Sequence, residues 1–113
     1  MAFKKGDIYL VNFDPTVGHE VKKTRPAVIV SNDVNNANSP IISITPITSN
    51  ISRIFSFEVE LPVGSSGLTE KSKAMINQTR AIDKARLIKH VGRLDRQVLE
   101  KIDRALKLHY DLD

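Results

Sequence analysis

Short apolar segments separated by turn residues make up most of the chain. Residues 8–13 are rich in β-branched and aromatic side chains and end at an Asp-Pro turn dipeptide at positions 14–15. Residues 27–31 are continuously apolar, which is typical of a strand buried on both faces. Residues 41–47 predict a third strand, and Pro46 marks the approach of its end, because proline cannot donate a hydrogen bond to a ladder.

The second half of the chain alternates more regularly before its period changes. Residues 55–61 alternate apolar and polar positions, which predicts a strand with its Phe, Val and Leu side chains in the core. Residues 74–82 and 87–94 predict two more strands, whereas the Asn- and Asp-rich residues 32–40 predict a loop with one helical turn. These short elements favour a small, strongly bent antiparallel sheet or barrel.

A helical period begins at Asp95, a residue type that commonly caps helix N-termini. The apolar side chains that follow recur every three or four positions: Val98, Leu99, Ile102, Ala105 and Leu106. His109 falls at the boundary of the same face, where a structural role is expected. About 16 residues of amphipathic helix are predicted to close one side of the sheet. The predicted fold class is therefore α+β, mainly antiparallel β, with a C-terminal helix.

Length and composition exclude several classes of protein. The 113 residues are expected to form a single domain spanning 1–113. Cysteine is absent, which excludes disulfides and thiolate nucleophiles or metal ligands. The N-terminus lacks the apolar stretch of a secretory signal, and no apolar run approaches the ~20 residues of a membrane span. A cytoplasmic protein without membrane contact is expected.

The net charge of +4 is distributed unevenly. Residues 71–96 hold eight basic and two acidic side chains, whereas residues 97–113 hold three basic and four acidic ones. A basic stretch followed by a nearly neutral tail suggests that a polyanion faces one part of the fold. A solvated basic face without a partner is the alternative.

Arg25 follows a polar, cationic loop and comes directly before the buried strand. Its planar guanidinium suits phosphate oxygens, although a surface ion pair with Glu20 is an equally simple interpretation. His19 lies six residues earlier, and a histidine ordinarily titrates near pH 6.5, so it can exchange a proton. Thr48 places a hydroxyl just beyond Pro46. His19 could equally be a loop residue without a task, and Thr48 a turn residue.

Metal and cofactor motifs are missing from the sequence. His19, His90 and His109 are far apart, with no carboxylate partners at ligand spacing. No Gly-rich phosphate loop is present, so no metal and no cofactor are expected. RNA carries its own nucleophile, the 2′-hydroxyl. An arginine, a hydroxyl and a histidine would then be sufficient parts for cleavage.

Five sequence blocks together resemble the MazF/PemK (Kid) toxin family. They are GDIY at 6–9, DPTVGHE at 14–20, TRPAVIVSND at 24–33, PIT at 46–48 and NQTRAIDKARL at 77–87. The blocks occur in the order and at the spacing of that family, and the match runs from about residue 4 to the final helix.

The resemblance implies an SH3-like barrel of about five to seven strands with a C-terminal helix, which agrees with the pattern above. It also implies a homodimeric toxin of a type II toxin–antitoxin system that is blocked by a cognate MazE-like antitoxin. The implied activity is sequence-specific, metal-independent cleavage of single-stranded RNA such as mRNA. Attack by the 2′-hydroxyl would leave a 2′,3′-cyclic phosphate and a 5′-hydroxyl end.

The resemblance also implies roles for individual residues. By position, Arg25 and Thr48 match the Arg and Thr that some chromosomal members use for catalysis. The plasmid Kid/PemK branch uses an Arg and an Asp where this chain has Met75 and Asn77, which cannot replace them in proton transfer. Because an Arg is very hard to deprotonate, Arg25 is expected to hold the phosphate and stabilise the transition state. His19, which matches the Gly-His-Glu of the plasmid branch, is then the candidate for proton transfer.

The Lys22-Lys23 pair departs from the family pattern, because many relatives carry small residues before the Arg-Pro. Both lysines are expected to contact backbone phosphates, which would position RNA without reading its bases. The full set expected to bind RNA is Lys22, Lys23, Thr24, Asn32, Ser49, Asn77, Gln78 and Arg80.

Two other functions compete with the ribonuclease. One is a nucleic-acid-binding barrel without catalysis. The other is a protein-targeting toxin like CcdB, the poison of DNA gyrase, whose fold resembles this family's. A gyrase poison acts through its C-terminal end and would not need a phosphate-facing set such as Arg25 and Thr48.

Replacing both Lys22 and Lys23 by Gln should flatten the salt dependence of RNA binding. Each lost phosphate contact lowers the slope of log K against log salt by about 0.7 on a single strand, so a change of about 1.4 is expected. Titrations of a short RNA at several salt concentrations measure the slope. A matched variant that replaces Lys101 and Lys107 should retain it, and an unaltered slope in the Lys22/Lys23 variant would count against the assignment.

Overall fold

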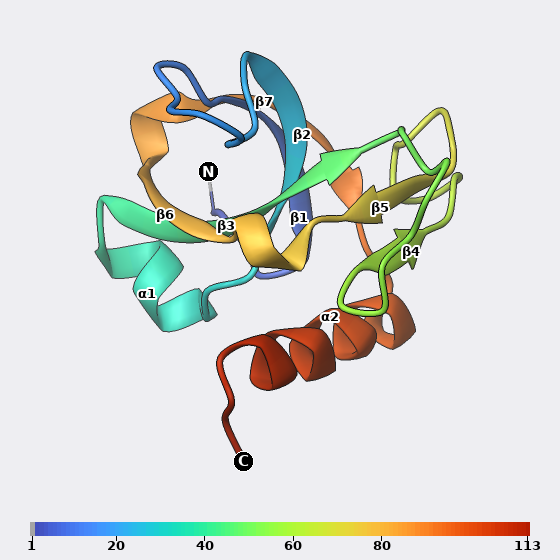
Figure 1. Ribbon diagram of the computed structural model, residues 1–113. Coiled ribbons are helices and arrows are strands. Elements are labelled where there is room, and N and C mark those ends of the chain that lie inside the picture. Colours follow the sequence, from blue (N-terminus) through green and yellow to red (C-terminus); the bar gives the residue numbers. More distant parts are fainter. Residues whose placement is uncertain (1) are drawn as a thin grey trace.

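One antiparallel sheet of seven strands dominates the computed structural model, which describes residues 2–113 (Figure 1). The sheet order is β4-β5-β3-β2-β1-β7, and β6 pairs with β3 outside this path. The elements are β1 (Asp7–Asn12), β2 (Thr24–Ile29), α1 (Asp33–Asn38), β3 (Ile41–Thr48), β4 (Val59–Leu61), β5 (Ser72–Ala74), η1 (Ile76–Gln78), β6 (Arg80–Asp83), η2 (Lys84–Arg86), β7 (Leu87–Arg93) and α2 (Arg96–His109). The two η elements are short 3-10 helices.

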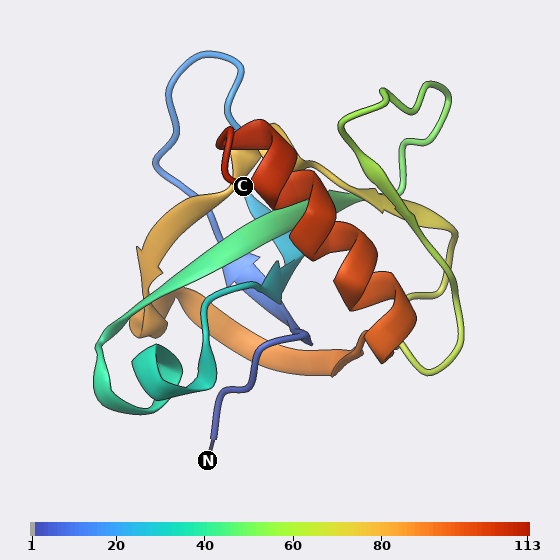
Figure 2. The ribbon, with the colours of Figure 1, turned by 90° about the horizontal axis from the view of Figure 1, so that it is seen from below.

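The sheet curls into an open barrel, and α2 runs across one side of it (Figure 2). Within residues 2–113, no pairing joins β7 back to β4 or β6, so the barrel is not closed. The expected mainly antiparallel fold with a C-terminal helix is confirmed. None of the described helices is both long and apolar enough to cross a membrane.

The second half of strand β2 is buried on both faces, as its continuous apolar sequence predicts. Ala27, Val28 and Ile29 have no solvent exposure. Val28 packs into one core cluster, whose largest members include Ile8, Ile47, Leu61, Ile76 and Ile102. Ala27 and Ile29 pack into a second cluster, which includes Val11, Phe13, Ile42, Ile44 and Ile82. Successive residues of the strand therefore belong to different clusters, because side chains alternate between the faces of a strand.

Strand β3 pairs with two strands, β5 and β6, along one edge and with β2 along the other edge. It pairs with β6 along residues 41–44 and with β5 at Ile47 and Thr48. The strand end that Pro46 is expected to mark lies at Thr48. Pro46 still contributes a carbonyl, which accepts a hydrogen bond from Met75 N–H (2.9 Å), and the ladder to β5 begins only after it.

Two predicted strands are shorter or interrupted in the structure. Residues 55–61 form strand only from Val59, and the rings of Phe55 and Phe57 stack on each other (5.2 Å between centroids) instead of entering the core. The predicted strand over 74–82 is interrupted by η1. Five residues, 75–79, separate β5 from β6, whereas only residues 45 and 46 separate their partners on β3, so the extra residues leave the ladder and form η1.

Helix α2 confirms the predicted cap and apolar face. The Asp95 carboxylate accepts a hydrogen bond from Val98 N–H (3.0 Å). Ile102 is fully buried in the first core cluster, and Val98, Ala105 and Leu106 pack against the same cluster. His109 is exposed at the end of the helix, so it lies outside the core and outside the site described below.

A close backbone crossing connects β7 to the segment before β5. A Cβ on Gly92 would overlap the carbonyl of Ser66, and a Cβ on Gly67 would overlap the carbonyl of Val91. Only glycine allows two backbones to approach so closely.

Substituting Gly92→Ala is expected to lower the free energy of unfolding by about 2–3 kcal/mol, because backbone atoms must move to admit the methyl group. Denaturant-induced unfolding measures this change. The exposed Ile88 on the same strand provides a control, and Ile88→Ala should change stability by no more than about 0.5 kcal/mol. Equal unfolding midpoints for Gly92→Ala and the wild type would contradict the crossing.

Candidate functional site

The loop between β1 and β2 and the end of β3 border an open depression of about 370 Å³. His19 lies in the loop, Arg25 is near the start of β2 and Thr48 ends β3, and all three residues line this depression. Because Ala27 pairs with Pro46, the same antiparallel register continued by two residues brings Arg25 beside Thr48. The three residues predicted to be catalytic therefore lie together.

The Arg25 side chain is exposed, and no acidic residue among residues 2–113 forms an ion pair with it. The interpretation that Arg25 pairs with Glu20 is therefore wrong. Glu20 turns back within the loop, where its carboxylate accepts a hydrogen bond from Val17 N–H (2.7 Å). The guanidinium consequently retains its donors for an external anion.

A second depression of about 230 Å³ lies on the other side of Arg25 and Thr48, which line both. Thr24 and Ser49, two residues predicted to bind RNA, line this second depression. The Arg25 guanidinium and the Thr48 hydroxyl thus lie between two adjoining depressions. An extended polyanion bound to these two groups has a depression available on each side.

The loop between β1 and β2 is held at its base by several hydrogen bonds. Phe13 N–H donates to the Lys23 carbonyl (2.8 Å), and Lys23 N–H donates to the Asp14 carboxylate (2.9 Å). The Arg86 guanidinium donates to the carbonyls of Asn12 (3.0 Å) and Asp14 (2.8 Å). Lys22 and Lys23 are exposed and line the same depression as Arg25, so the loop adds positive charge beside the guanidinium.

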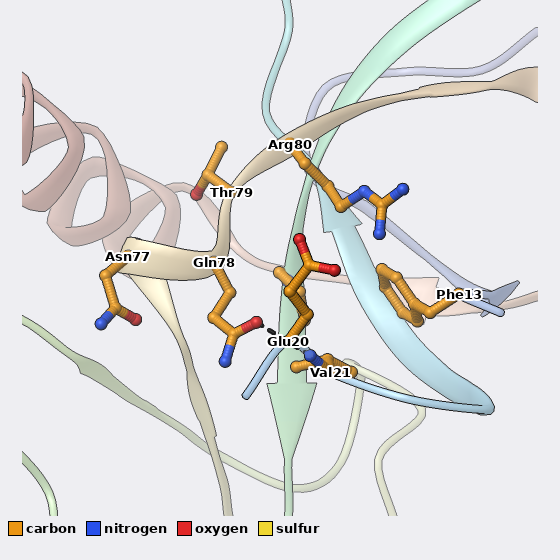
Figure 3. A pocket seen from close by; sticks show the side chains of 8 residues that line it. Phe13, Glu20, Val21, Asn77, Gln78, Thr79 and Arg80 are labelled. Atoms are coloured by element: carbon orange, nitrogen blue, oxygen red, sulfur yellow. Dashed lines mark hydrogen bonds between the residues drawn. The ribbon is translucent and has the colours of Figure 1, made fainter. Parts of the chain in front are cut away.

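A third depression of about 270 Å³ adjoins the first (Figure 3). Its lining includes the residues of the Asn-Gln-Thr-Arg block that are predicted to bind RNA. Asn77, Gln78 and Arg80 line it together with Glu20. The Arg80 guanidinium lies 6.0 Å from the ring centroid of Phe13. This hollow therefore offers both donors and acceptors next to the Arg25 depression.

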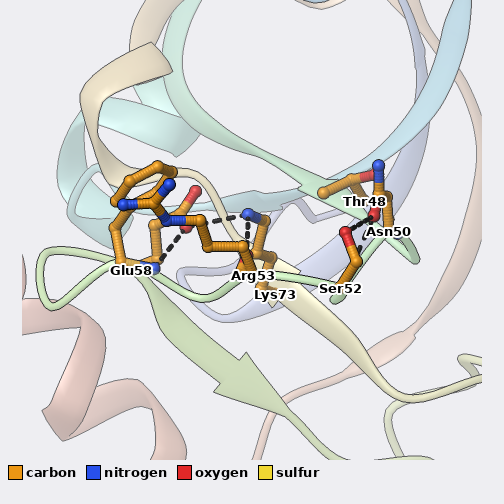
Figure 4. A network of polar contacts seen from close by, with 7 residues as sticks. Thr48, Asn50, Ser52, Arg53, Glu58 and Lys73 are labelled. Atoms are coloured by element: carbon orange, nitrogen blue, oxygen red, sulfur yellow. Dashed lines mark hydrogen bonds and ion pairs between the residues drawn. The ribbon is translucent and has the colours of Figure 1, made fainter.

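Polar contacts organise the segment after Thr48 (Figure 4). The Thr48 hydroxyl accepts a hydrogen bond from Asn50 N–H (3.2 Å), and the Asn50 carboxamide oxygen accepts one from the Ser52 hydroxyl (2.9 Å). These local turns keep the segment folded back beside the end of β3.

Lys73 is a residue that sequence reasoning misplaced. It counts among the basic residues expected to face a polyanion, but it is buried opposite Thr48 in the β3–β5 ladder. Its ammonium group donates to the Glu58 carboxylate and to the Arg53 carbonyl, both at 2.8 Å (Figure 4). Lys73 therefore ties the 49–58 loop to the strand beside Thr48. In the sequence, the position of Lys73 between the small residues Ser72 and Ala74 was the feature that could have indicated its burial.

The structure does not bring every predicted residue to the site. The Asn32 side chain caps α1 by accepting from Asn35 N–H (2.8 Å), at the opposite end of β2 from Arg25. Arg93 pairs with Asp7 (2.9 Å) on β1, away from both site loops. The predicted basic face is therefore only partly available to a polyanion. In the described part of the chain, no group of three or more His, Asp or Glu residues could hold a metal ion.

Sequence comparisons give one family over almost the whole chain. The model for a PemK-like, MazF-like toxin of type II toxin–antitoxin systems matches residues 4–110. A protein named endoribonuclease MazF9 from Mycobacterium tuberculosis is 40% identical over 114 residues, which cover 96% of this chain and 97% of the relative. A protein named endoribonuclease EndoA from Bacillus subtilis is 33% identical over 109 residues, covering 96% and 94% of the two chains.

Solved structures show the same fold. A MazF from Deinococcus radiodurans superposes with a TM-score of 0.87 at 23% identity and covers 99% of each chain. An endoribonuclease from a mycobacterial species, solved with its cognate antitoxin, gives a TM-score of 0.79 at 18% identity, covering 99% of this chain and 96% of that one. At these identities the likeness concerns the fold alone.

Proposed function

Because the chain belongs to the family of PemK-like, MazF-like toxins of type II toxin–antitoxin systems, we propose that it is an endoribonuclease that cleaves single-stranded RNA without a metal ion. The observation that carries this proposal is the unpaired guanidinium of Arg25, which shares an open depression with Thr48 and His19. Two relatives that match almost the whole chain are named endoribonucleases. This favours cleavage over a silent RNA-binding barrel or a gyrase poison.

In the proposed reaction, the RNA 2′-hydroxyl attacks the adjacent phosphorus, and the bond from phosphorus to the 5′-oxygen breaks. The products are a 2′,3′-cyclic phosphate and a 5′-hydroxyl end. The nucleophile loses a proton, and the leaving oxygen gains one. Arg25 binds the non-bridging phosphate oxygens and stabilises the negative charge of the transition state. Thr48 contributes one further donor on the same side.

His19 is the proposed proton carrier. Arg25 cannot take this role, because a guanidinium stays protonated in proteins. Thr48 is a weak acid and a weak base, so it serves better as a donor of a fixed hydrogen bond. The imidazole of His19 is exposed in the same depression and can reach a bound RNA.

The surrounding residues bind the rest of the substrate in this proposal. Lys22, Lys23, Thr24 and Ser49 contact the RNA backbone on the two sides of Arg25. Asn77 and Arg80 present hydrogen-bonding groups to a base in the adjoining depression. Asn32 takes no part, because its side chain caps α1.

We propose in addition that the toxin works as a homodimer in the cytoplasm and is neutralised by a MazE-like antitoxin. The antitoxin part is supported by two solved structures, in which MazF of Deinococcus radiodurans is combined with MazE and a mycobacterial endoribonuclease with its cognate antitoxin.

The wild-type protein is expected to cut a long single-stranded RNA at discrete positions in EDTA, leaving cyclic-phosphate ends. Arg25→Ala should lower the single-turnover rate by about 10²–10³-fold, the usual loss on removing one transition-state donor. Arg96→Ala, at a highly exposed arginine on α2, is the matched control and should cleave like the wild type. Intact RNA, or cleavage that requires Mg²⁺, would overturn the proposal.

Replacing His19 by Ala should lower the cleavage rate by about 10²–10⁴-fold and remove the limb of the pH–rate profile that a titrating imidazole produces. His109→Ala, at the exposed end of α2, is the control for loss of a surface histidine. If His19→Ala keeps the wild-type rate and pH profile, another group transfers the proton.

A further inference from the structure

We infer that Gln78 is a positioning residue that holds the tip of the β1–β2 loop, residues 15–22, against η1 at the border of the site. The inference rests on the proposed function for its consequence in catalysis, but not for the geometry. The Gln78 carboxamide oxygen accepts a hydrogen bond from Val21 N–H (2.9 Å) (Figure 3). The carboxamide nitrogen donates to the His19 carbonyl (3.3 Å). A single side chain thus binds the loop backbone on both sides of Glu20.

The loop tip has few other polar connections to the rest of the fold, although Val21 packs against the second core cluster. Within residues 15–22 the remaining hydrogen bonds join Val17 and Glu20 to each other. Among the described residues, Gln78 is the only one outside the loop that forms a hydrogen bond with this segment. The base is held separately, by the contacts of Lys23 and Arg86.

Gln78 itself stands on a rigid support. It ends η1, where its N–H donates to the Met75 carbonyl (2.9 Å). The preceding Ile76 has no solvent exposure and belongs to the first core cluster. The Thr79 hydroxyl is 2.7 Å from both the Ile76 carbonyl and the Thr45 hydroxyl. The hydrogen bonds that connect the loop tip to the rest of the fold therefore come from one side chain, which is itself anchored beside the core.

The chemistry of this contact requires a carboxamide at this length. Its two partners are a donor, Val21 N–H, and an acceptor, the His19 carbonyl, and a carboxamide supplies the matching acceptor and donor on two separate atoms. Glutamate keeps the acceptor and loses the donor, whereas alanine loses both. Because both the oxygen and the nitrogen of the carboxamide already bind the loop, we assign Gln78 to the loop and not to the RNA-binding role predicted from the sequence.

The held segment carries His19 and leads directly into Lys22 and Lys23, which line the depression with Arg25. Catalysis depends on holding such groups in place, since small displacements of a reacting group cost large factors in rate. Release of the tip would move His19 and Lys22 away from the phosphate site, while Lys23 stayed at the loop base and Arg25 and Thr48 stayed on their strands.

Amide hydrogen exchange in the RNA-free protein tests the geometry. Gln78→Ala should raise the exchange rate of the Val21 amide about tenfold, because its hydrogen-bond acceptor is lost. Gln78→Glu should keep this amide protected, since a carboxylate still accepts. The neighbouring Asn77 is exposed, and the only described side chain that hydrogen-bonds to the loop-tip backbone from outside the loop is that of Gln78, so Asn77→Ala is the matched control and should leave Val21 exchange unchanged. Unchanged exchange in Gln78→Ala would overturn the inference, whether or not the protein cleaves RNA.

Cleavage kinetics test the consequence. At saturating RNA, Gln78→Ala should lower the rate about tenfold through misplacement of His19, and Gln78→Glu should recover part of this loss. If Gln78 instead contacts RNA directly, the added negative charge should make Gln78→Glu slower than Gln78→Ala, and the positioning role is then wrong. A wild type that does not cleave RNA, together with faster Val21 exchange in Gln78→Ala, would refute the proposed function and leave the loop contact standing.

Discussion

The burial of β2 on both faces is the constraint on which the site depends. Ala27, Val28 and Ile29 are fully enclosed between two core clusters, so the strand cannot slide without exposing apolar side chains on both sides. Arg25 lies two residues before this enclosed segment. Its backbone is consequently fixed while its guanidinium remains in solvent, and the antiparallel register with β3 then determines that Thr48 is its neighbour.

One short segment, residues 72–78, supports both loops that border the site. Lys73 holds the 49–58 loop through Glu58 and Arg53, and Gln78 holds the tip of the β1–β2 loop. The Lys73–Glu58 pair is nearly buried, with side chains 10% and 5% exposed, so removing one partner would leave an uncompensated charge. Because Ile76 anchors the same segment in the first core cluster, both loops that border the site are connected to the hydrophobic core.

The sequence predicted those features whose cause is local. Continuous apolar character identified the buried strand around Val28, and the helical period with its Asp95 cap identified α2. The predicted secondary structure was wrong where it depends on contacts with residues distant in the sequence. Residues 55–61 alternate like a strand, yet only the last three pair, because Glu58 turns inward to meet Lys73. Residues 74–82 look continuous in sequence, yet residues 75–79 leave the ladder between the two segments that pair with β3.

The amino-acid sequence by itself determined the fold class, the family blocks and the candidates Arg25, Thr48 and His19, since these depend on residue type and on spacing along the chain. Only the tertiary structure decided which side chains are available. It left Arg25 unpaired, buried Lys73, used Asn32 as a helix cap and turned Gln78 toward the loop. The physical reason is that a polar group's role depends on the partner that satisfies it, and these partners lie 15 to 59 residues away for Lys73 and Gln78.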